Sequence, residues 1–307
     1  MDLRTLGTLA VSLSLPLGLS GATPSSPPTE EWPAVEPAVV IAEGFQPTGW
    51  AEFQWRNDRW EPTRRQEKSY DQQGRLTTIR EESWFMDKWQ VSHVETMAYD
   101  EAGRLVEKLR QETIANSLRN RGRHTYEHRP DQTIVSDLAA WSHEQRWLPL
   151  TQEIFLYDDA GRWVSHTTQS RQGNLTRRQF FVRHVYDAAG RLTQRHRQRD
   201  QGGRWVDAER VDFTYDELGR LTRAAWFVMG RGQWTPGIQI THEYNAAGRR
   251  SITNRHTRGP TDGFVVSSRL VFGYDQHGNE VERVSQQPRD GGWIDGRKET
   301  YSFRPLP

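Results

Sequence analysis

Five tryptophans recur ten residues before a tyrosine and form the most regular candidate for ligand chemistry. They are Trp60, Trp89, Trp147, Trp205 and Trp234. Aromatic faces stack on sugar rings and arginines donate hydrogen bonds to hydroxyl groups, so such a row can form a carbohydrate-binding platform. The even spacing along a strand places each tryptophan on the same face as its tyrosine. Packing inside the protein is therefore the alternative to ligand binding.

Histidines and carboxylates are the other residues with a capacity for chemistry. His124, His184 and His242 each precede a tyrosine by two residues. In an open meander they lie four strands apart, about 19 Å at about 4.8 Å per strand, which is too far to share a metal ion. The chain has no cysteine, no nucleophile elbow, no phosphate-binding glycine loop and no zinc motif. We expect no catalytic residue, no metal and no cofactor, although a glycosidase pair of carboxylates leaves no motif.

Charge and composition point away from several partner classes. The 307 residues include 41 basic and 40 acidic side chains, and both signs are scattered along the chain. This balance gives no electrostatic footprint for nucleic acid or for an anionic membrane. Hydrophobic residues make up only 34% of the chain, which suits a narrow sheet with one face in water.

The elements that position these residues are copies of one motif, Tyr-Asp-x-x-Gly-Arg-Leu. Clear copies begin at Tyr70, Tyr99, Tyr186 and Tyr215, weaker ones begin at Tyr157, Tyr244 and Tyr274, and Tyr126 and Tyr301 keep only the tyrosine. Successive tyrosines are 29, 27, 31, 29, 29, 29, 30 and 27 residues apart. Such a period indicates one supersecondary unit repeated along the chain.

The motif predicts a three-residue hairpin loop. In the copy at Tyr215, Glu217-Leu218-Gly219 forms the loop, Gly219 takes a positive φ, and Tyr215 packs beside Leu221. Asp216 accepts hydrogen bonds within the turn and pairs with Arg220. The structural turn residues predicted in this way are Asp71, Gly74, Asp100, Gly103, Asp158, Gly161, Asp187, Gly190, Asp216, Gly219, Gly248 and Gly278.

Residues on either side of each loop alternate between apolar and polar, which is typical of half-buried strands. A second turn beside each tryptophan, such as Gly202-Gly203, gives two strands per repeat, and Trp55 and Trp84 can pair with Trp60 and Trp89 across it. The copy at Tyr126 contains Pro130 and predicts a bulge, a longer loop or a bend. Glu280 replaces the leucine, which predicts a terminal cap. The fold expected is all-β: tandem antiparallel hairpins in a long twisted, coiled or curled meander sheet.

The chain divides into three segments. Residues 1–22 have a charged start, an apolar stretch and small residues before a cleavage site, which is typical of a secretory signal peptide. Residues 23–44 form a proline-rich linker, and residues 45–307 form the repeat domain. No later apolar run is long enough to span a bilayer. We therefore expect a secreted protein in the periplasm, at the cell surface or outside the cell.

The motif resembles the YD repeat of the Rhs family, the β-hairpin units of the spiral shells of bacterial Rhs proteins and of teneurins. The resemblance covers roughly residues 45–303, and Tyr274-Asp275 with Gly278-Asn279 resembles the family's Gly-Asn variant. It implies secretion, a spiral sheet, and surface contact, carbohydrate binding or enclosure of a passenger. The period here is about 29 rather than about 20 residues, and no toxin domain follows Tyr301, which favours a small stand-alone relative.

These observations predict a secreted, non-catalytic scaffold that binds a glycan or another surface protein, without nucleic acid and without a membrane span once the signal is removed. Two alternatives stay open. One is a secreted glycan hydrolase that uses a carboxylate pair, and the other is a purely structural protein of the cell envelope.

Overall fold

The computed structural model describes residues 39–129, 133–172, 175–259 and 263–306, and the regular structure in these ranges consists of antiparallel β-strands. The strands are β1 (Phe45–Arg56), β2 (Arg59–Tyr70), β3 (Leu76–Phe85), β4 (Lys88–Tyr99), β5 (Leu105–Ile114), β6 (Ser117–His128), β7 (Thr133–Trp141), β8 (Trp147–Tyr157), β9 (Trp163–Gln172), β10 (Leu175–Tyr186), β11 (Leu192–Gln201), β12 (Arg204–Tyr215), β13 (Leu221–Gly230), β14 (Gln233–Tyr244), β15 (Arg250–Arg258), β16 (Phe264–Tyr274), β17 (Glu280–Arg289) and β18 (Gly292–Pro305). The predicted signal peptide and most of the predicted linker lie outside the described residues. No helix in the described ranges is long and apolar enough to cross a bilayer.

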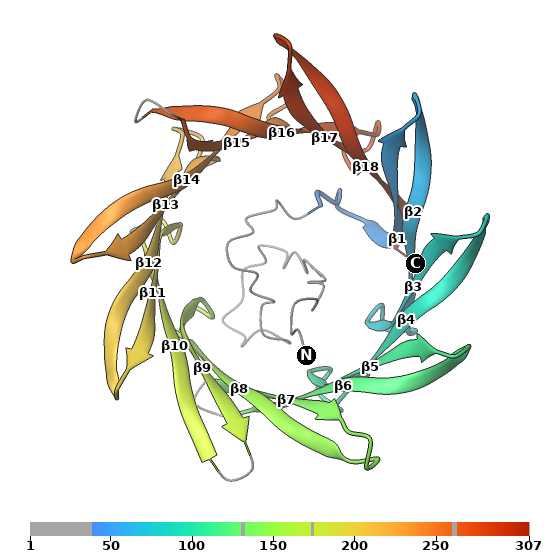
Figure 1. The fold of residues 1–307 in the computed structure, drawn as a ribbon, viewed down its shortest axis with the longest axis vertical. Helices are drawn as coiled ribbons and strands as arrows, with labels where there is room; N and C mark the ends of the chain where they lie inside the picture. Colours follow the sequence, from blue (N-terminus) through green and yellow to red (C-terminus); the bar gives the residue numbers. More distant parts are fainter. Residues whose placement is uncertain (1–38, 130–132, 173–174, 260–262, 307) are drawn as a thin grey trace.

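The strands form one closed barrel rather than an open sheet (Figure 1). Each strand pairs with its sequence neighbours, and β18 pairs with β1 from Phe45 opposite Pro305 to Gln54 opposite Arg297. The all-β class is confirmed, but the expectation of a long open meander sheet is wrong, because the sheet closes on itself. Closure removes the two edge strands, whose unpaired backbone groups would otherwise invite association with other chains.

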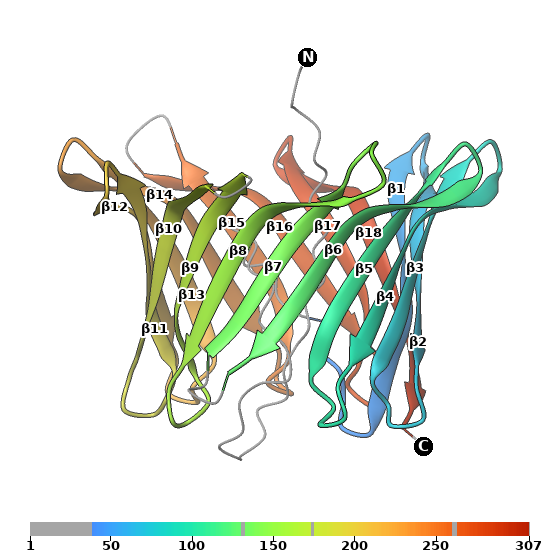
Figure 2. The ribbon, with the colours of Figure 1, turned by 90° about the horizontal axis from the view of Figure 1, so that it is seen from below.

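The two ends of the barrel differ in shape. At the flared end, the hairpins that join each odd strand to the next even strand splay outward, as at Asn57-Asp58 between β1 and β2 (Figure 2). The other end, which we call the turn end, carries the tyrosine motifs and stays narrow. Near the flared end, each of these nine hairpins has a register shift, such as that between Glu52 and Phe53. A β-bulge bends its strand and increases the local twist, which accounts for the splaying.

The turns at the narrow end share one hydrogen-bond pattern. In the copy at Tyr215, Gly219 has φ of 77° and Tyr215 stands opposite Leu221, the register predicted from the motif. Asp216 accepts hydrogen bonds from the backbone N–H groups of Leu218 and Arg220 and from the Arg220 side chain, at 3.0, 2.8 and 2.7 Å. The aspartate therefore satisfies the backbone donors of the loop that the glycine makes possible.

Replacing Gly219 by valine should lower the free energy of unfolding by about 1 to 2 kcal/mol. A Cβ at this position would meet only the end of Arg191, at 3.8 Å, so the penalty comes from the positive φ and not from a clash. Gly230→Ala is the matched control, because its Cβ would meet nothing within 4 Å and its φ is ordinary. Equal urea midpoints for the two variants would contradict the turn assignment.

The bulges also change which face a residue occupies. Trp205 lies ten residues before Tyr215, yet the two side chains point to opposite faces of the sheet, because the extra residue Ala208 shifts the register between Asp207 and Glu209. The expectation that tryptophans and tyrosines share a face was therefore wrong. The tyrosines face the lumen, and the row of five tryptophans lies on the outer wall near the flared end. Trp55 and Trp84 do pair with Trp60 and Trp89 as predicted, with ring centroids 5.2 and 5.1 Å apart.

His128, and not Tyr126, occupies the tyrosine position of the third repeat. His128 stands opposite Ile134 and its Nε2 lies 2.8 Å from the Leu105 carbonyl, the contact that tyrosines make elsewhere. Tyr99, His128, Tyr157 and Tyr186 are thus evenly spaced by 29 residues. The expected bulge near Tyr126 is absent, since β6 and β7 pair without a register shift, and Pro130 lies outside the described residues.

Tyrosine hydroxyls join neighbouring repeats. Six of them donate a hydrogen bond to the carbonyl oxygen 23 or 24 residues earlier, as Tyr215 does to Leu192 at 2.8 Å. A register shift lies beside each acceptor residue and leaves its carbonyl outside the regular ladder. The arginine of the preceding turn also lies over the ring, with Arg191 at 5.1 Å from the centre of Tyr215. The motif therefore holds consecutive hairpins together as well as forming each turn.

Tyr215→Phe should lower the free energy of unfolding by about 1 kcal/mol, because it removes this bond and leaves the Leu192 carbonyl without it. Tyr157 provides an internal control. Its hydroxyl is buried and has no partner among the described residues, because Ile134 pairs regularly with Phe155. Tyr157→Phe should leave the urea midpoint unchanged or raise it, and a loss as large as that of Tyr215→Phe would refute the proposed link.

Residues from the two ends of the chain complete the barrel. Arg304 lies over the Tyr70 ring at 5.5 Å, as turn arginines do elsewhere, and Tyr70 donates its hydrogen bond to Pro47. Gln46 accepts hydrogen bonds from Arg304 and donates one to the Gly74 carbonyl. The contact between β18 and β1 thus reproduces the contact between ordinary repeats.

Candidate binding site on the lumen wall

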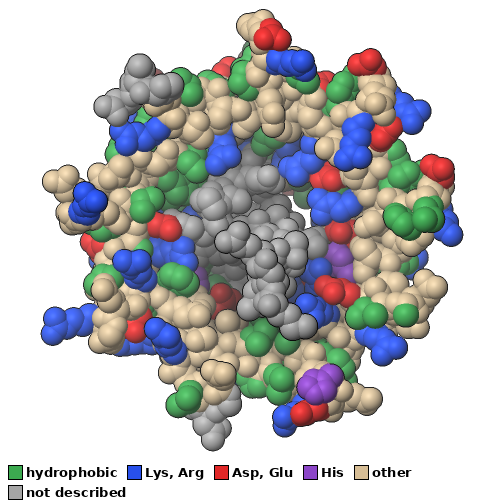
Figure 3. All heavy atoms as spheres, viewed as in Figure 1, with side chains coloured by type: hydrophobic (Ala, Val, Ile, Leu, Met, Phe, Trp, Pro, Cys, Tyr) green, Lys and Arg blue, Asp and Glu red, His purple; other side chains and the backbone are tan. Residues whose placement is uncertain are grey.

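The lumen is lined by both polar and apolar side chains. A barrel of this strand number is about 35 Å across between opposite backbones, too wide for its own side chains to fill. Charged residues dominate the inner wall from β17 through β1 to β5, whereas the buried Val211, Ala224 and Trp226 form an apolar cluster on the opposite side. Figure 3 shows acidic, basic and histidine side chains along this inner wall. The wall is suited to a ligand that combines polar groups with an apolar face.

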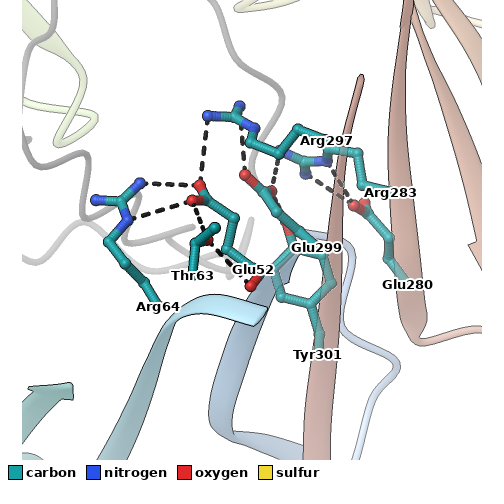
Figure 4. Close-up of polar contacts among 8 residues, drawn as sticks. All are labelled: Glu52, Thr63, Arg64, Glu280, Arg283, Arg297, Glu299 and Tyr301. Atoms are coloured by element: carbon teal, nitrogen blue, oxygen red, sulfur yellow. Dashed lines mark hydrogen bonds and ion pairs between the residues drawn. The ribbon is translucent and has the colours of Figure 1, made fainter. Parts of the chain in front are cut away.

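Charged side chains cross the contact between the first and last strands (Figure 4). Glu52 of β1 stands directly opposite Glu299 of β18, and Arg297 lies between the two carboxylates, 3.6 and 3.3 Å from them. Arg64 of β2 pairs with Glu52 at 2.9 Å, and Thr63 donates a hydrogen bond to Glu52 at 2.7 Å. Burial acts to raise the pKa of Glu52, but these hydrogen bonds and the arginine charges outweigh it and hold the pKa below its usual value. The arginines thus allow two like charges to meet where the barrel closes.

Glu280 and Arg283 of β17 form the most buried ion pair of this network. Their contact is 2.8 Å, and Glu280 has no exposed surface. The backbone of Val40 exchanges hydrogen bonds with Glu280, and Ala42 donates one to the Asn279 side chain at 2.8 Å. The expectation that Glu280 marks a terminal cap was therefore wrong. Asn279 and Glu280 depart from the Arg-Leu pattern because they bind the chain just before β1.

A second cluster of buried titratable groups lies on β3 and β4. Glu81, His93 and Glu95 are 3, 3 and 5% exposed. Glu81 Oε1 lies 3.8 Å from His93 Nδ1, while Glu81 Oε2, His93 Nε2 and Glu95 Oε2 have no hydrogen-bond partner among the described residues. Burial raises the pKa of Glu81 and lowers that of His93 to about 4. Buried polar atoms of this kind require a partner, and a bound molecule is one that can supply it.

The apolar side of the lumen carries hydrogen-bond donors next to aromatic and aliphatic groups. Trp226 packs with Phe213 and Ile240, yet its buried indole nitrogen has no partner among the described residues. On the next two strands, β14 and β15, the Nε2 atom of His242 and the Nε and Nη1 atoms of Arg250 are also buried without hydrogen-bond partners among the described residues. An apolar ring face beside donors is the arrangement by which proteins bind sugar rings.

The tryptophan row predicted as a platform lies outside the lumen. One face of each ring is covered by a cation 4.7 to 5.1 Å from a ring centre: Lys298 over Trp60, Arg65 over Trp89, Arg123 over Trp147, Arg178 over Trp205 and Arg210 over Trp234. Trp60, Trp89 and Trp147 also meet the edge of a second tryptophan. The rings therefore have little free face for sugar stacking, and the platform remains a prediction.

Sequence reasoning missed the lumen residues although their signal was present. Counting back by twos from Tyr99 gives Met97, Glu95 and His93, which places a carboxyl group and an imidazole on a face expected to form a core. His124, His184 and His242 alternate with phenylalanine in successive repeats, a pattern compatible with a metal site or with a structural unit of two hairpins. In the part of the chain that the structure describes, no group of three or more His, Asp or Glu residues is placed to hold a metal ion.

The outer wall is also polar, and its side chains bond across strands. Gln194 donates to Asp212 at 3.0 Å, Gln198 donates to Asp207 at 2.9 Å, and Arg65 pairs with Glu82. Arg65 of β2 and Arg210 of β12, which pairs with Asp212 at 3.0 Å, lie at mid-height of their strands, where a barrel embedded in lipid carries an apolar band. Both faces of the sheet therefore suit contact with water.

Comparisons with known proteins return distant structural likenesses. A porin-like protein from Bacteroides uniformis has 10% identity over 84% of this chain and 98% of its own, with a TM-score of 0.43. A porin-like protein from Bacteroides vulgatus has 13% identity over 65% of this chain and 98% of its own, with a TM-score of 0.33. The Tc holotoxin pore of Photorhabdus luminescens has 12% identity over 80% of this chain and 15% of its own, with a TM-score of 0.28. No family model and no curated protein matches the chain.

Proposed function

We propose that the protein is an exported, non-catalytic barrel of the periplasm or cell surface that binds a glycan on its lumen wall. The observation that carries this proposal is the set of buried lumen polar atoms without partners among the described residues, with the indole nitrogen of Trp226, in the cluster against which Phe213 packs, as the clearest case. Sugar hydroxyls satisfy such donors, and the apolar ring face packs on the aromatic group. Kinship with YD-repeat proteins is part of the same proposal.

The polar outer wall supports a location in water rather than within a bilayer. Arg65 and Arg210 lie on the outside at mid-height, and each of these charges would cost on the order of 2 to 4 kcal/mol at the centre of a membrane. The apolar stretch before residue 22 and the lack of cysteine agree with export as a soluble barrel.

A glycan array followed by calorimetry on the best ligand tests the proposal. Trp226→Phe keeps most of the packing but removes the N–H donor, so we expect affinity to fall by about five- to tenfold. Trp60→Phe on the outer wall should leave affinity unchanged. If Trp60→Phe weakens binding and Trp226→Phe does not, the outer platform is the site and the lumen assignment is wrong. If no glycan binds, a structural envelope protein becomes the better description.

A glycan hydrolase is the second candidate, because Glu81 and Glu95 project from neighbouring strands into the lumen. Burial raises the pKa of Glu81, as a general acid requires, while Glu95 lies 3.9 Å from Lys108 and 4.0 Å from Arg110. Release of reducing ends from the array ligand would reveal such an activity. Turnover that Glu81→Gln abolishes would replace the binding proposal with this one.

A further inference from the structure

The mouth of the barrel at the flared end exposes apolar side chains on its inner surface. Val228 follows the lumen-facing Trp226 by two residues, so it lies on the inner face of its splayed hairpin. Seven of the nine splayed hairpins carry such a residue with 37 to 76% of its surface exposed: Phe85, Ile114, Leu148, Leu175, Val228, Val265 and Ile294. A soluble protein rarely gathers large exposed apolar side chains at one end without a partner.

Basic residues occupy the tips of the same hairpins. We define a tip as the segment from the last residue of the odd strand to the third residue of the even strand. Each of the nine tips carries Arg or Lys: Arg56 and Arg59, Lys88, Arg119, Arg146, Arg177, Arg204, Arg231, Arg258 and Arg289. These tips hold ten basic and six acidic residues, a net charge of +4, whereas the whole chain has +1. Figure 3, which looks into this end, shows apolar and basic side chains around the splayed hairpins.

We propose that the flared mouth docks end-on against the surface of a lipid bilayer with anionic headgroups. The apolar residues enter the boundary between headgroups and acyl chains, and the arginines and lysines bind the phosphates around them. The polar wall and the narrow turn end stay in water. This docking does not depend on what the lumen binds.

A bilayer fits the mouth better than a protein partner does. An apolar residue recurs on the inner face of most hairpins, but its side chain and its exact place vary: Phe85 ends β3, Leu175 begins β10 and Ile294 is the third residue of β18. A shaped protein epitope would require particular side chains at particular points, whereas a lipid surface requires only that each be apolar. The ring is also wider than the barrel itself, at least about 35 Å, and only a flat and extended partner meets all of its tips together.

Co-sedimentation of the full chain with vesicles tests the proposal. One set of vesicles contains phosphatidylethanolamine and phosphatidylglycerol in equal parts, and the other contains phosphatidylcholine alone. We expect binding to the anionic vesicles that the triple variant Phe85→Ser, Ile114→Ser, Leu175→Ser weakens by at least about tenfold. The matched control replaces three exposed apolar residues outside the mouth, Leu156→Ser, Val185→Ser and Leu218→Ser, and should bind as the unmodified chain does.

A charge variant separates the basic tips from the apolar ring. Arg59→Gln with Lys88→Gln and Arg204→Gln should weaken binding to the anionic vesicles and leave binding to phosphatidylcholine unchanged. Circular dichroism of each variant shows whether the barrel is intact. Equal losses in the mouth variant and the control variant would overturn the proposal. Failure of the unmodified chain to bind any vesicle would also overturn the proposal, and a protein would then be the better candidate for the partner of the mouth.

Discussion

Replacing Arg283 by methionine should lower the free energy of unfolding by about 3 to 5 kcal/mol. Arg283 is 4% exposed and pairs with Glu280, which is fully buried beside the Val40 backbone. Methionine keeps much of the volume but leaves the carboxylate without its counter-charge, 2.8 Å from where the guanidinium was. Urea unfolding, followed by near-ultraviolet circular dichroism, measures the loss.

This loss of stability should come from the unpaired carboxylate of Glu280 and not from the missing side chain of Arg283. A double variant, Arg283→Met with Glu280→Leu, places an aliphatic residue where most repeats have one and should recover more than half of the loss. Arg289→Met is the matched control, because Arg289 pairs with Asp290 at 3.6 Å in the open and should change stability little. If the double variant is as unstable as the single one, the buried pair is not the reason for the loss.

Acid should destabilise the barrel between about pH 6.5 and pH 4. Burial lowers the pKa of His93, His124 and His242 to about 4 in each case, helped by neighbouring Arg or Lys charges. A folded-state pKa below the unfolded value means that the unfolded chain binds more protons in this range, so stability falls as the pH falls. Each histidine should account for about 3 kcal/mol by pH 4. Glu81 and Glu280 act in the opposite direction because their pKa values are raised.

His242→Phe gives the sharpest test of this pH dependence. Phe213 and Phe272 occupy the same position in the neighbouring repeats, so the barrel accommodates phenylalanine there. The variant loses the 2.8 Å contact with Thr253, so its free energy of unfolding should be about 1 kcal/mol lower than that of the unmodified chain near pH 7.5. At pH 4 its free energy of unfolding should be about 2 kcal/mol higher, because it has no histidine to protonate at this position. His143→Phe, on an exposed tip, should show no such crossing. Parallel stability curves for His242→Phe and the unmodified chain would contradict the assignment.

Local chemistry made the turns and strands predictable from sequence. Glycine is the residue that adopts positive φ without strain, and aspartate satisfies the loop N–H groups, so Tyr-Asp-x-x-Gly-Arg-Leu specifies a hairpin and the pairing of Tyr215 with Leu221 wherever it occurs. The repeat period then implied an all-β chain. Each of these inferences depends on residues only a few positions apart.

Barrel closure, the face that Trp205 occupies and the clustering of charge at one end depend on contacts between residues far apart in the sequence, and only the structure shows them. Nothing in the motif states that β18 meets β1, because closure depends on Arg304 reaching Tyr70 and on Arg297 separating Glu52 from Glu299, contacts made across the length of the chain. Trp205 lies on the outer wall because of a one-residue bulge. Side chains alternate between the two faces of a strand, so one inserted residue moves every residue beyond it to the opposite face. Charges that are scattered in sequence, such as Lys88 and Arg204, gather at one end only because every repeat turns in the same direction there.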